Sequence, residues 1–266
     1  MKSFQQITLL LLTAAACAAP ALAADSSADE IVKRSLESFY YAGNSMRARV
    51  SMKLINRQGN VREREMTILR LNLGNSGDQR YYIYFHGPAD VKRTSFLIWK
   101  YPAKDDDRWI YVPTLKLVKR ISADDKRSSF VGSDFTYEDL SGRDLEDETR
   151  VLVRKEDLAG RPTYVIESKP KTPSDYSRRL SWIDRERWLP LREEYFDARN
   201  EPLRTFTADK VEQIGGQWSV TVRSMKNLQS GHRTEVVFRE TEYGVGIKQD
   251  IFTERYLRDA PAQWVR

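Results

Sequence analysis

The sequence predicts a mainly β protein with a few helices, in which antiparallel strands form a curved sheet. This sheet is expected to be an incomplete (half) barrel with a helical lid or plug. From Met46 onward, apolar and polar residues alternate with a period of two, as in strands with one buried face. Short turns rich in polar residues and glycine separate about a dozen such segments. A sheet of so many strands curls, because strand twist accumulates across it.

The first expected element is an amphipathic helix at residues 27–41. Ser27 and Glu30 form a capping box, in which the serine accepts a backbone N–H of the first turn and the glutamate reaches back. Apolar side chains recur at helical spacing from Ile31 to Tyr40, and Gly43 ends the segment. This helix is the natural lid or plug for the concave side of the sheet.

Strands are expected to follow one another through the rest of the chain, with a short helix or loop at 122–129 and a closing helix at 248–258. The expected strands are 46–54, 61–73, 80–86, 94–101, 108–112, 115–121, 149–156, 163–168, 178–183, 188–196, 203–214, 218–225 and 234–241. No linker or fixed-period repeat divides these segments. Residues 24–266 are therefore predicted to form a single domain.

The first 23 residues have the pattern of a cleavable signal peptide. Lys2 gives a short basic region, residues 7–16 are apolar, and Ala21-Leu-Ala23 is a small-x-small cleavage signal. The apolar run is too short for a transmembrane helix. We expect export with cleavage after Ala23, and the alternative is a lipoprotein anchored at Cys17.

Composition narrows the chemistry further. Cys17 is the only cysteine, so a chain cut after Ala23 has no disulfide, thiolate metal site or cysteine nucleophile. The net charge of +6 would suit nucleic acid, but export argues against that partner. An anionic membrane surface, contacted peripherally or transiently, suits the charge better, and a solvated surface explains it equally well.

The residue pattern predicts no catalytic, metal or cofactor site, and we expect a protein that is not an enzyme. His86 and His232 are the only histidines, and neither has a second ligand at metal-binding spacing. Ser133 lies outside any nucleophile elbow. Glu138 and Asp139 are adjacent and would point to opposite faces of a strand, so they are expected in a solvated loop.

Aromatic residues between positions 96 and 137 are the stronger indication of function. They could simply fill the interior of a curved sheet. As a set beside an incomplete barrel, they favour an apolar cavity, because ligand pockets are mostly apolar with a few polar groups. The residues predicted to line the cavity or its rim are Phe96, Trp99, Trp109, Tyr111, Phe130, Phe135 and Tyr137.

Two motifs in residues 108–140 carry a resemblance to a known family. Trp109-Ile-Tyr111-Val-Pro113 precedes the run Lys-Leu-Val-Lys-Arg-Ile, and Phe-Val-Gly-Ser-Asp-Phe-Thr-Tyr-Glu-Asp-Leu140 follows it. In these motifs and in architecture, the chain resembles the outer membrane lipoprotein-sorting family of the LolA/LolB-like superfamily. The resemblance implies a periplasmic half-barrel that binds lipid or lipoprotein acyl chains under covering helices. The carriers of this superfamily hold their lid with an arginine near the second strand. Arg70 lies in that region without the Arg-Pro context and receives no role from the sequence.

The function predicted from these observations is that of a periplasmic carrier that shelters acyl chains in an apolar cavity. Members of the resembled branch often accompany RND-type exporters, which implies transfer of cargo between an inner-membrane RND-type transporter and the outer membrane. One alternative is a non-enzymatic periplasmic adaptor of a transporter or assembly complex, acting through the charged surface at 116–148. An exported hydrolase is a further alternative.

Overall fold

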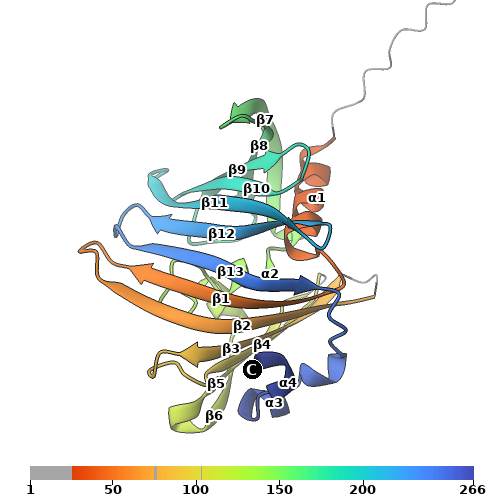
Figure 1. Ribbon diagram of the computed structural model, residues 1–266. Coiled ribbons are helices and arrows are strands. Elements are labelled where there is room, and N and C mark those ends of the chain that lie inside the picture. The colour runs from red at the N-terminus through yellow and green to blue at the C-terminus, as the bar shows by residue number, and fades with distance from the viewer. Residues whose placement is uncertain (1–25, 75–76, 103) are drawn as a thin grey trace, which may run out of the picture.

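One open antiparallel sheet of thirteen strands dominates the computed structural model, which describes residues 26–74, 77–102 and 104–266. The expected signal peptide, its cleavage after Ala23 and the alternative anchor Cys17 lie outside the described residues. The strand order is β6-β5-β4-β3-β2-β1-β13-β12-β11-β10-β9-β8-β7, so β6 and β7 are unpaired edges (Figure 1). The prediction of a mainly β, incomplete barrel is confirmed.

The elements agree with the predicted order, and most strands extend one or two residues beyond a predicted limit. The strands are β1 (Ser45–Ile55), β2 (Val61–Leu73), β3 (Asp78–Gly87), β4 (Ser95–Lys100), β5 (Asp107–Val112), β6 (Leu117–Ile121), β7 (Glu148–Leu158), β8 (Arg161–Pro170), β9 (Arg178–Asp184), β10 (Pro190–Phe196), β11 (Pro202–Ile214), β12 (Gln217–Asn227) and β13 (Arg233–Tyr243). The helices are α1 (Ala28–Tyr40), α2 (Glu138–Ser141), α3 (Glu254–Arg258) and α4 (Ala262–Val265). Single 3₁₀ turns lie at Pro113–Leu115, Ala123–Arg127, Leu145–Asp147 and Gln249–Ile251.

The sheet consists of two meanders that meet at the pairing of the first strand with the last. Strands β1 to β6 run outward from this pair on one side, and β13 back to β7 run outward on the other. In the shared pair, Val50 of β1 lies opposite Phe238 of β13. Because β6 and β7 are opposite edges, residues 122–147 must cross the full width of the sheet. Figure 1 shows this segment, with α2, on the inner side of the curved sheet.

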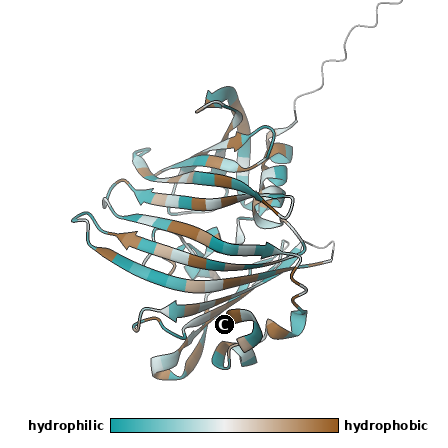
Figure 2. Cartoon of the chain, viewed as in Figure 1, coloured by the Kyte–Doolittle hydropathy of each residue, from teal (hydrophilic) through white to brown (hydrophobic). Residues whose placement is uncertain are grey.

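Strand β1 shows why the sheet has one concave apolar face. Met46, Ala48, Val50, Met52 and Leu54 alternate along it, and none is more than 8% exposed. They join a core that also contains side chains of β2, β3, β12 and β13. Figure 2 shows the corresponding alternation of hydropathy along the central strands. The period of two predicted from the sequence is therefore the period of burial.

The crossing segment fills the concave face in the half of the sheet that contains β1 to β6. Phe130 is fully buried, and its ring lies against those of Phe85, Phe96 and Tyr137 at centroid distances of 5.1 to 6.0 Å. A tight turn presents it, because the Phe130 N–H donates to the Phe135 carbonyl at 2.8 Å. The turn between Phe130 and Phe135 therefore orients two buried rings.

The C-terminal segment covers part of the opposite, convex face. Leu69, Tyr82 and Leu97 point outward from the sheet and are buried by Phe252 and Leu257. The single helix expected at 248–258 is instead a 3₁₀ turn followed by α3, and α4 lies beyond it. The Phe252 carbonyl bonds a tryptophan of the sheet rather than a helical N–H, since Trp99 Nε1 donates to it at 2.9 Å. This contact explains why the expected helix is interrupted between the 3₁₀ turn and α3.

We predict that Phe130→Ala lowers the free energy of unfolding by about 3–5 kcal/mol, because it opens a cavity among three rings. Urea unfolding followed by tryptophan fluorescence measures this difference. Val151→Ala is the control, since Val151 is 62% exposed on the edge strand β7, and it should change stability by less than about 0.5 kcal/mol. Equal effects of the two substitutions would contradict the packing described for the crossing segment.

Candidate binding site beneath helix α1

Helix α1 lies across the concave side near β7, β8, β9 and β12. Ser27 caps its N-terminus by accepting the Glu30 N–H at 3.2 Å, as the capping box predicts. The Glu30 carboxylate binds Arg34 instead of reaching back. Ile31 and Val32 are buried against an apolar cluster of β8 and β9. The helix is therefore fixed at its start, and its last residues extend toward the centre of the sheet.

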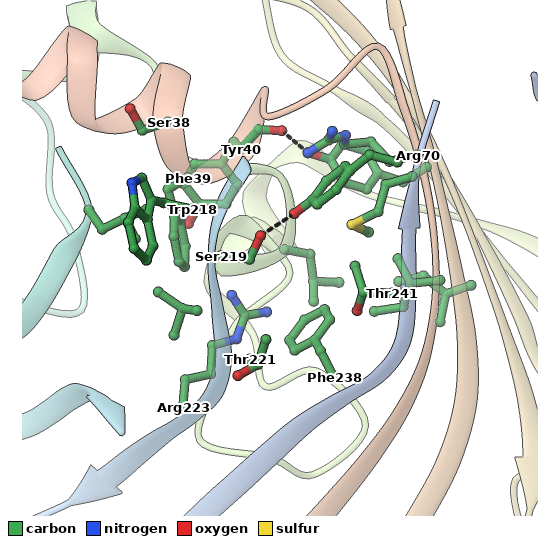
Figure 3. A pocket seen from close by; sticks show the side chains of 18 residues that line it. Ser38, Phe39, Tyr40, Arg70, Trp218, Ser219, Thr221, Arg223, Phe238 and Thr241 are labelled. Carbon is green, nitrogen blue, oxygen red and sulfur yellow. Dashed lines mark hydrogen bonds between the residues drawn. The ribbon is translucent and has the colours of Figure 1, made fainter. Parts of the chain in front are cut away.

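A first cavity, of about 80 Å³, lies under the C-terminal end of α1. Its walls come from α1, β1, β2, β3, β12 and β13, with contributions from α2 and the β9–β10 turn. The lining residues are Ser38, Phe39, Tyr40, Met46, Ile68, Arg70, Tyr81, Ile83, Leu140, Leu189, Trp218, Ser219, Val220, Thr221, Arg223, Phe238, Thr241 and Tyr243 (Figure 3). Most are apolar, and none of these described residues is acidic.

A second cavity, of about 60 Å³, lies on the other side of Phe39 and Tyr40 and has a different character. Charged side chains of the crossing segment and of β7, β9 and β10 line it, together with apolar residues of α1, β11 and β12. The two aromatic side chains at the end of α1 therefore separate an apolar compartment from a charged one.

Polar side chains of β2 and β3 hold the end of α1. Arg70 is only 3% exposed and donates to the carbonyls of Tyr40, Ala42 and Gly43. Burial lowers the pKa of Arg70, an effect that nearby tyrosines oppose. Gln79 Nε2 adds a hydrogen bond of 2.9 Å to the Tyr40 carbonyl. These carbonyls have no N–H partner within the helix, so the contacts replace the missing hydrogen bonds.

Asn72 completes this attachment, because its Nδ2 donates to the Tyr41 and Gly43 carbonyls at 3.0 and 2.8 Å. The sequence left Arg70 without a role, and its partners became visible only in the fold. Backbone carbonyls from residues about thirty positions earlier carry no signal in the sequence.

The charged cavity contains a network of buried ion pairs. Arg143 contacts Glu138 at 3.0 Å and Asp139 at 2.8 Å, and Arg179 contacts Glu148 at 2.8 Å and Glu193 at 2.7 Å. Two tyrosines donate into it: Tyr176 to Glu148 at 2.7 Å and Tyr195 to Glu193 at 2.6 Å. Each buried charge therefore has an oppositely charged partner, which burial requires.

The expectation that Glu138 and Asp139 lie in a solvated loop is wrong. They are 3% and 7% exposed and begin the short helix α2. A helical turn places both carboxylates within reach of Arg143, which a strand would not do. Both are engaged in structural ion pairs.

The environment of Asp139 shifts its ionisation. Burial alone would raise the pKa of Asp139, but Arg143, Arg204 and hydrogen bonds from Thr136 outweigh it and hold the pKa at about 2. The ionised form is thus stabilised in the folded protein relative to the unfolded chain. Stability from this group is present above its ordinary pKa of 3.8 and is lost as the pH falls toward 2.

The seven aromatic residues proposed from the sequence do not form one group. Phe96, Phe130, Phe135 and Tyr137 lie together on the concave side, and Phe135 also borders the charged cavity. Trp99, Trp109 and Tyr111 point to the convex face and pack with the C-terminal segment. Alternation explains the division, since Phe96 and Trp99 differ by an odd number of positions on β4.

None of the seven lines the apolar cavity under α1, whose walls sequence reasoning missed. Alternation could have placed Met46 and Ile68 on a common face. The chain gives no local sign, however, that β12 and β13 lie beside β1 or that α1 ends above them. The pairing of β1 with β13 is a long-range contact that no short pattern records.

The two histidines have local partners. His86 Nε2 lies 2.8 Å from Thr67 Oγ1 on the convex face, and burial together with Arg49 lowers the pKa of His86 to about 4. His232 Nδ1 lies 2.6 Å from Asp134. Across residues 26–74, 77–102 and 104–266, no three His, Cys, Asp or Glu side chains are grouped to hold a metal ion. None of the helices in these ranges is long and apolar enough to cross a membrane.

Solved structures share this architecture over most of the chain. A domain from Vibrio parahaemolyticus assigned to outer membrane lipoprotein sorting is 29% identical, with a TM-score of 0.80 over 87% of this chain and 98% of that one. A DUF1329 family protein from Desulfovibrio piger is 29% identical, with a TM-score of 0.77 over 85% and 95%. A LolA superfamily protein from Nitrosomonas europaea shares the fold at 19% identity, with a TM-score of 0.66 over 87% and 100%.

The open sheet and its covered concave face therefore define a half-barrel, a fold that the LolA superfamily protein shares. A family model of uncharacterized proteins matches residues 77–259, well over half of the chain. The chain belongs to this family, which carries the designation DUF1329. The resemblance inferred from residues 108–140 is confirmed. A search of curated proteins gave no match.

We predict that Asp139→Asn lowers the free energy of unfolding by about 3 kcal/mol at neutral pH, because it breaks a buried pair. The difference between wild type and variant should shrink by about 1 kcal/mol at pH 3, where part of the Asp139 contribution is already lost. Urea unfolding at both pH values measures it. A difference that is the same at pH 7 and pH 3 would contradict the depressed pKa of Asp139.

Proposed function

We propose that this protein is a carrier that binds lipid, or the acyl chains of lipoproteins, in the apolar cavity beneath α1. The observation that carries the proposal is the location of that cavity. It lies on the concave face of an open sheet and is covered by a helix whose end is held by polar contacts. The structural neighbour from Vibrio parahaemolyticus, assigned to lipoprotein sorting, supports the same class of cargo.

The physical basis is transfer of methylene groups out of water. Each buried methylene contributes about 0.8 kcal/mol, so an acyl chain crosses an aqueous space only inside an apolar shelter. The cavity of about 80 Å³ has room for several water molecules and not for an acyl chain. Cargo entry therefore requires movement, and α1 is the element that covers the cavity. In this proposal α1 is a lid that is closed in the present structure.

We also propose a cellular compartment, the periplasm, and a partner, an RND-type exporter, for this carrier. The signal-peptide pattern of residues 1–23 favours the periplasm, with residues 24–266 as one binding domain. The resemblance to the lipoprotein-sorting family favours transfer of cargo between an inner-membrane RND-type exporter and the outer membrane. Such a carrier needs no catalytic group, because the free energy of cargo transfer comes from burial of its chains.

The adaptor alternative, with an interface at residues 116–148, has less support. Glu138, Asp139, Arg143 and Glu148 are all buried and bound to one another or to neighbouring charges. The charged residues of this stretch that are exposed are Lys116, Lys119, Arg120, Asp124, Asp125 and Glu146. The surface left for a protein partner is therefore smaller than the sequence suggests.

The substitution Ile68→Trp tests whether the cavity beneath α1 is the site that binds cargo. Ile68 is 8% exposed and lines it from β2, so a tryptophan should occupy the space that an acyl chain needs. We expect binding of a dansyl-labelled fatty acid to fall about tenfold or more, equivalent to losing two methylene contacts. The measurement is a fluorescence titration of delipidated protein.

The matched control is Ile68→Leu, which keeps the volume and should bind as wild type does. Trp109→Ala on the convex face should also leave binding unchanged. If Trp109→Ala reduced binding and Ile68→Trp did not, the cargo site would lie on the convex face. If neither wild type nor control bound the probe and no lipid co-purified with the protein, the carrier function would be wrong.

Arg70→Met tests the lid. The substitution removes the hydrogen bonds to three carbonyls at the end of α1. We expect amide hydrogen exchange at residues 36–43 to accelerate about tenfold, with faster uptake of the fatty acid. Arg64→Met is the control, because Arg64 is a buried arginine on the same strand that pairs with Asp90 away from α1. Equal exchange at residues 36–43 in both variants would exclude Arg70 as the attachment.

A further inference from the structure

One half-buried arginine in the apolar cavity differs from the buried arginines of the fold. Arg223, on β12, has no hydrogen bond or ion pair to any other residue in the part of the chain that the structure describes. Arg143 and Arg179 each bind two carboxylates, and Arg70 binds backbone carbonyls. Arg204 pairs with Asp175 at 3.2 Å. The contacts described for the Arg223 guanidinium are with aromatic rings.

Three phenylalanine rings enclose this guanidinium. Its central carbon lies 4.7 Å from the ring centroid of Phe238, 5.4 Å from that of Phe39 and 5.6 Å from that of Phe135. Such cation–π contacts offset part of the lost hydration. Figure 3 shows the guanidinium pointing into the cavity, toward Ser219 and Phe238. The cation is thus placed where a bound molecule would lie.

The charge balance of the cavity leaves this cation uncompensated. No acidic residue lines the cavity among the described residues, and its other arginine, Arg70, is occupied by the end of α1. Burial lowers the pKa of Arg223, while Tyr40 and Asp139 oppose the shift, and a guanidinium stays protonated at neutral pH. Thr241 Oγ1, on the same wall, also has no described partner. The Arg223 side chain is half-buried and its Nε atom is fully buried without a hydrogen-bond partner. A charge held partly out of water without a counter-charge is costly, so an anion that binds there is favoured.

We propose that the cavity selects amphiphiles with an anionic head, and that Arg223 binds the head while the apolar walls and Phe39 enclose the chain. The inference rests on the carrier function proposed above and narrows its cargo to a carboxylate- or phosphate-headed lipid. A guanidinium suits this role because its fork of N–H donors matches either anion in a bidentate arrangement. The helix that covers the cavity thereby also covers the ion pair.

The test compares four amphiphiles with the same alkyl chain: laurate, dodecyl phosphate, dodecanol and dodecyltrimethylammonium. Delipidated wild-type protein should bind the two anions about tenfold or more tightly than dodecanol, as a charge-assisted hydrogen bond requires. The trimethylammonium compound should bind more weakly than dodecanol. The ratio of laurate to dodecyl phosphate affinity indicates whether a fatty acid or a phospholipid head is the source of the anion.

Arg223→Met should remove the preference for anions, so that laurate and dodecanol bind with similar affinity, because methionine keeps the apolar length without the charge. Arg223→Lys should keep part of the preference, since it retains the charge but not the fork. The midpoint of thermal unfolding should not fall in Arg223→Met, whereas Arg179→Met should lower it by leaving Glu148 and Glu193 unpaired.

The outcomes separate the two proposals. Equal affinity of wild type for laurate and dodecanol, or an anion preference that survives in Arg223→Met, would overturn the role of Arg223 while the carrier function stands. No binding of any of the four compounds would instead overturn the carrier function. The comparison of the compounds on wild type needs no variant, so the proposal remains testable even if Arg223→Met fails to fold.

Discussion

The packing of residues 122–147 against the concave face is the interaction on which the rest of the structure depends. An open sheet of this size has one inner face, and that face must be covered by something other than another sheet. The crossing segment supplies Phe130 to the apolar half and Arg143 to the charged half. It also supports α1, because Tyr40 donates to the Asp139 carbonyl and lies against Gly142. A Cβ at Gly142 would approach the Tyr40 ring to 2.9 Å, so the lid and its support fit only with glycine there.

The interior contains an unusual amount of charge for a protein proposed to carry lipid. Most of that charge neutralises itself, and it is confined to the compartment on one side of Phe39 and Tyr40. The separation keeps carboxylates away from the apolar cavity, where they would repel an anionic head. Arg223 lies on the cavity side of this boundary. It interacts electrostatically with Asp139 but takes no part in the hydrogen bonds that Asp139 makes with Arg143. The charged compartment is therefore internally neutralised, and the apolar one is the compartment proposed to bind cargo.

Much of the architecture follows from local patterns in the sequence, and the site does not. Alternation in β1 and the capping box at Ser27 depend on neighbouring residues, so they predict a strand and a helix directly. Trp99 and Phe96 look equally suited to a cavity, although the pleat sends them to opposite faces and only the docking of the C-terminal segment hides Trp99. The role of Arg70 depends on backbone carbonyls about thirty positions earlier, which carry no signal in the sequence. The role of Arg223 depends on which strands adjoin, and pairing between residues nearly two hundred positions apart leaves no local trace. Glu138 and Asp139 were misplaced for a different, local reason: a helical turn, and not a strand, brings Arg143 within reach of both carboxylates.

The pairing of β1 with β13 also governs how the chain can fold. The central ladder joins residues 46–55 to residues 233–243, and the crossing segment has no complete surface to pack on until that ladder exists. Contacts of such large sequence separation form slowly, because a long loop must close before any of them is gained. An incomplete chain lacks the middle of its own sheet and therefore cannot adopt the native state early. In the export proposed above, the chain passes through a membrane pore in extended form. Late closure at the seam is then an advantage, because the sheet is completed only after the last strand has emerged.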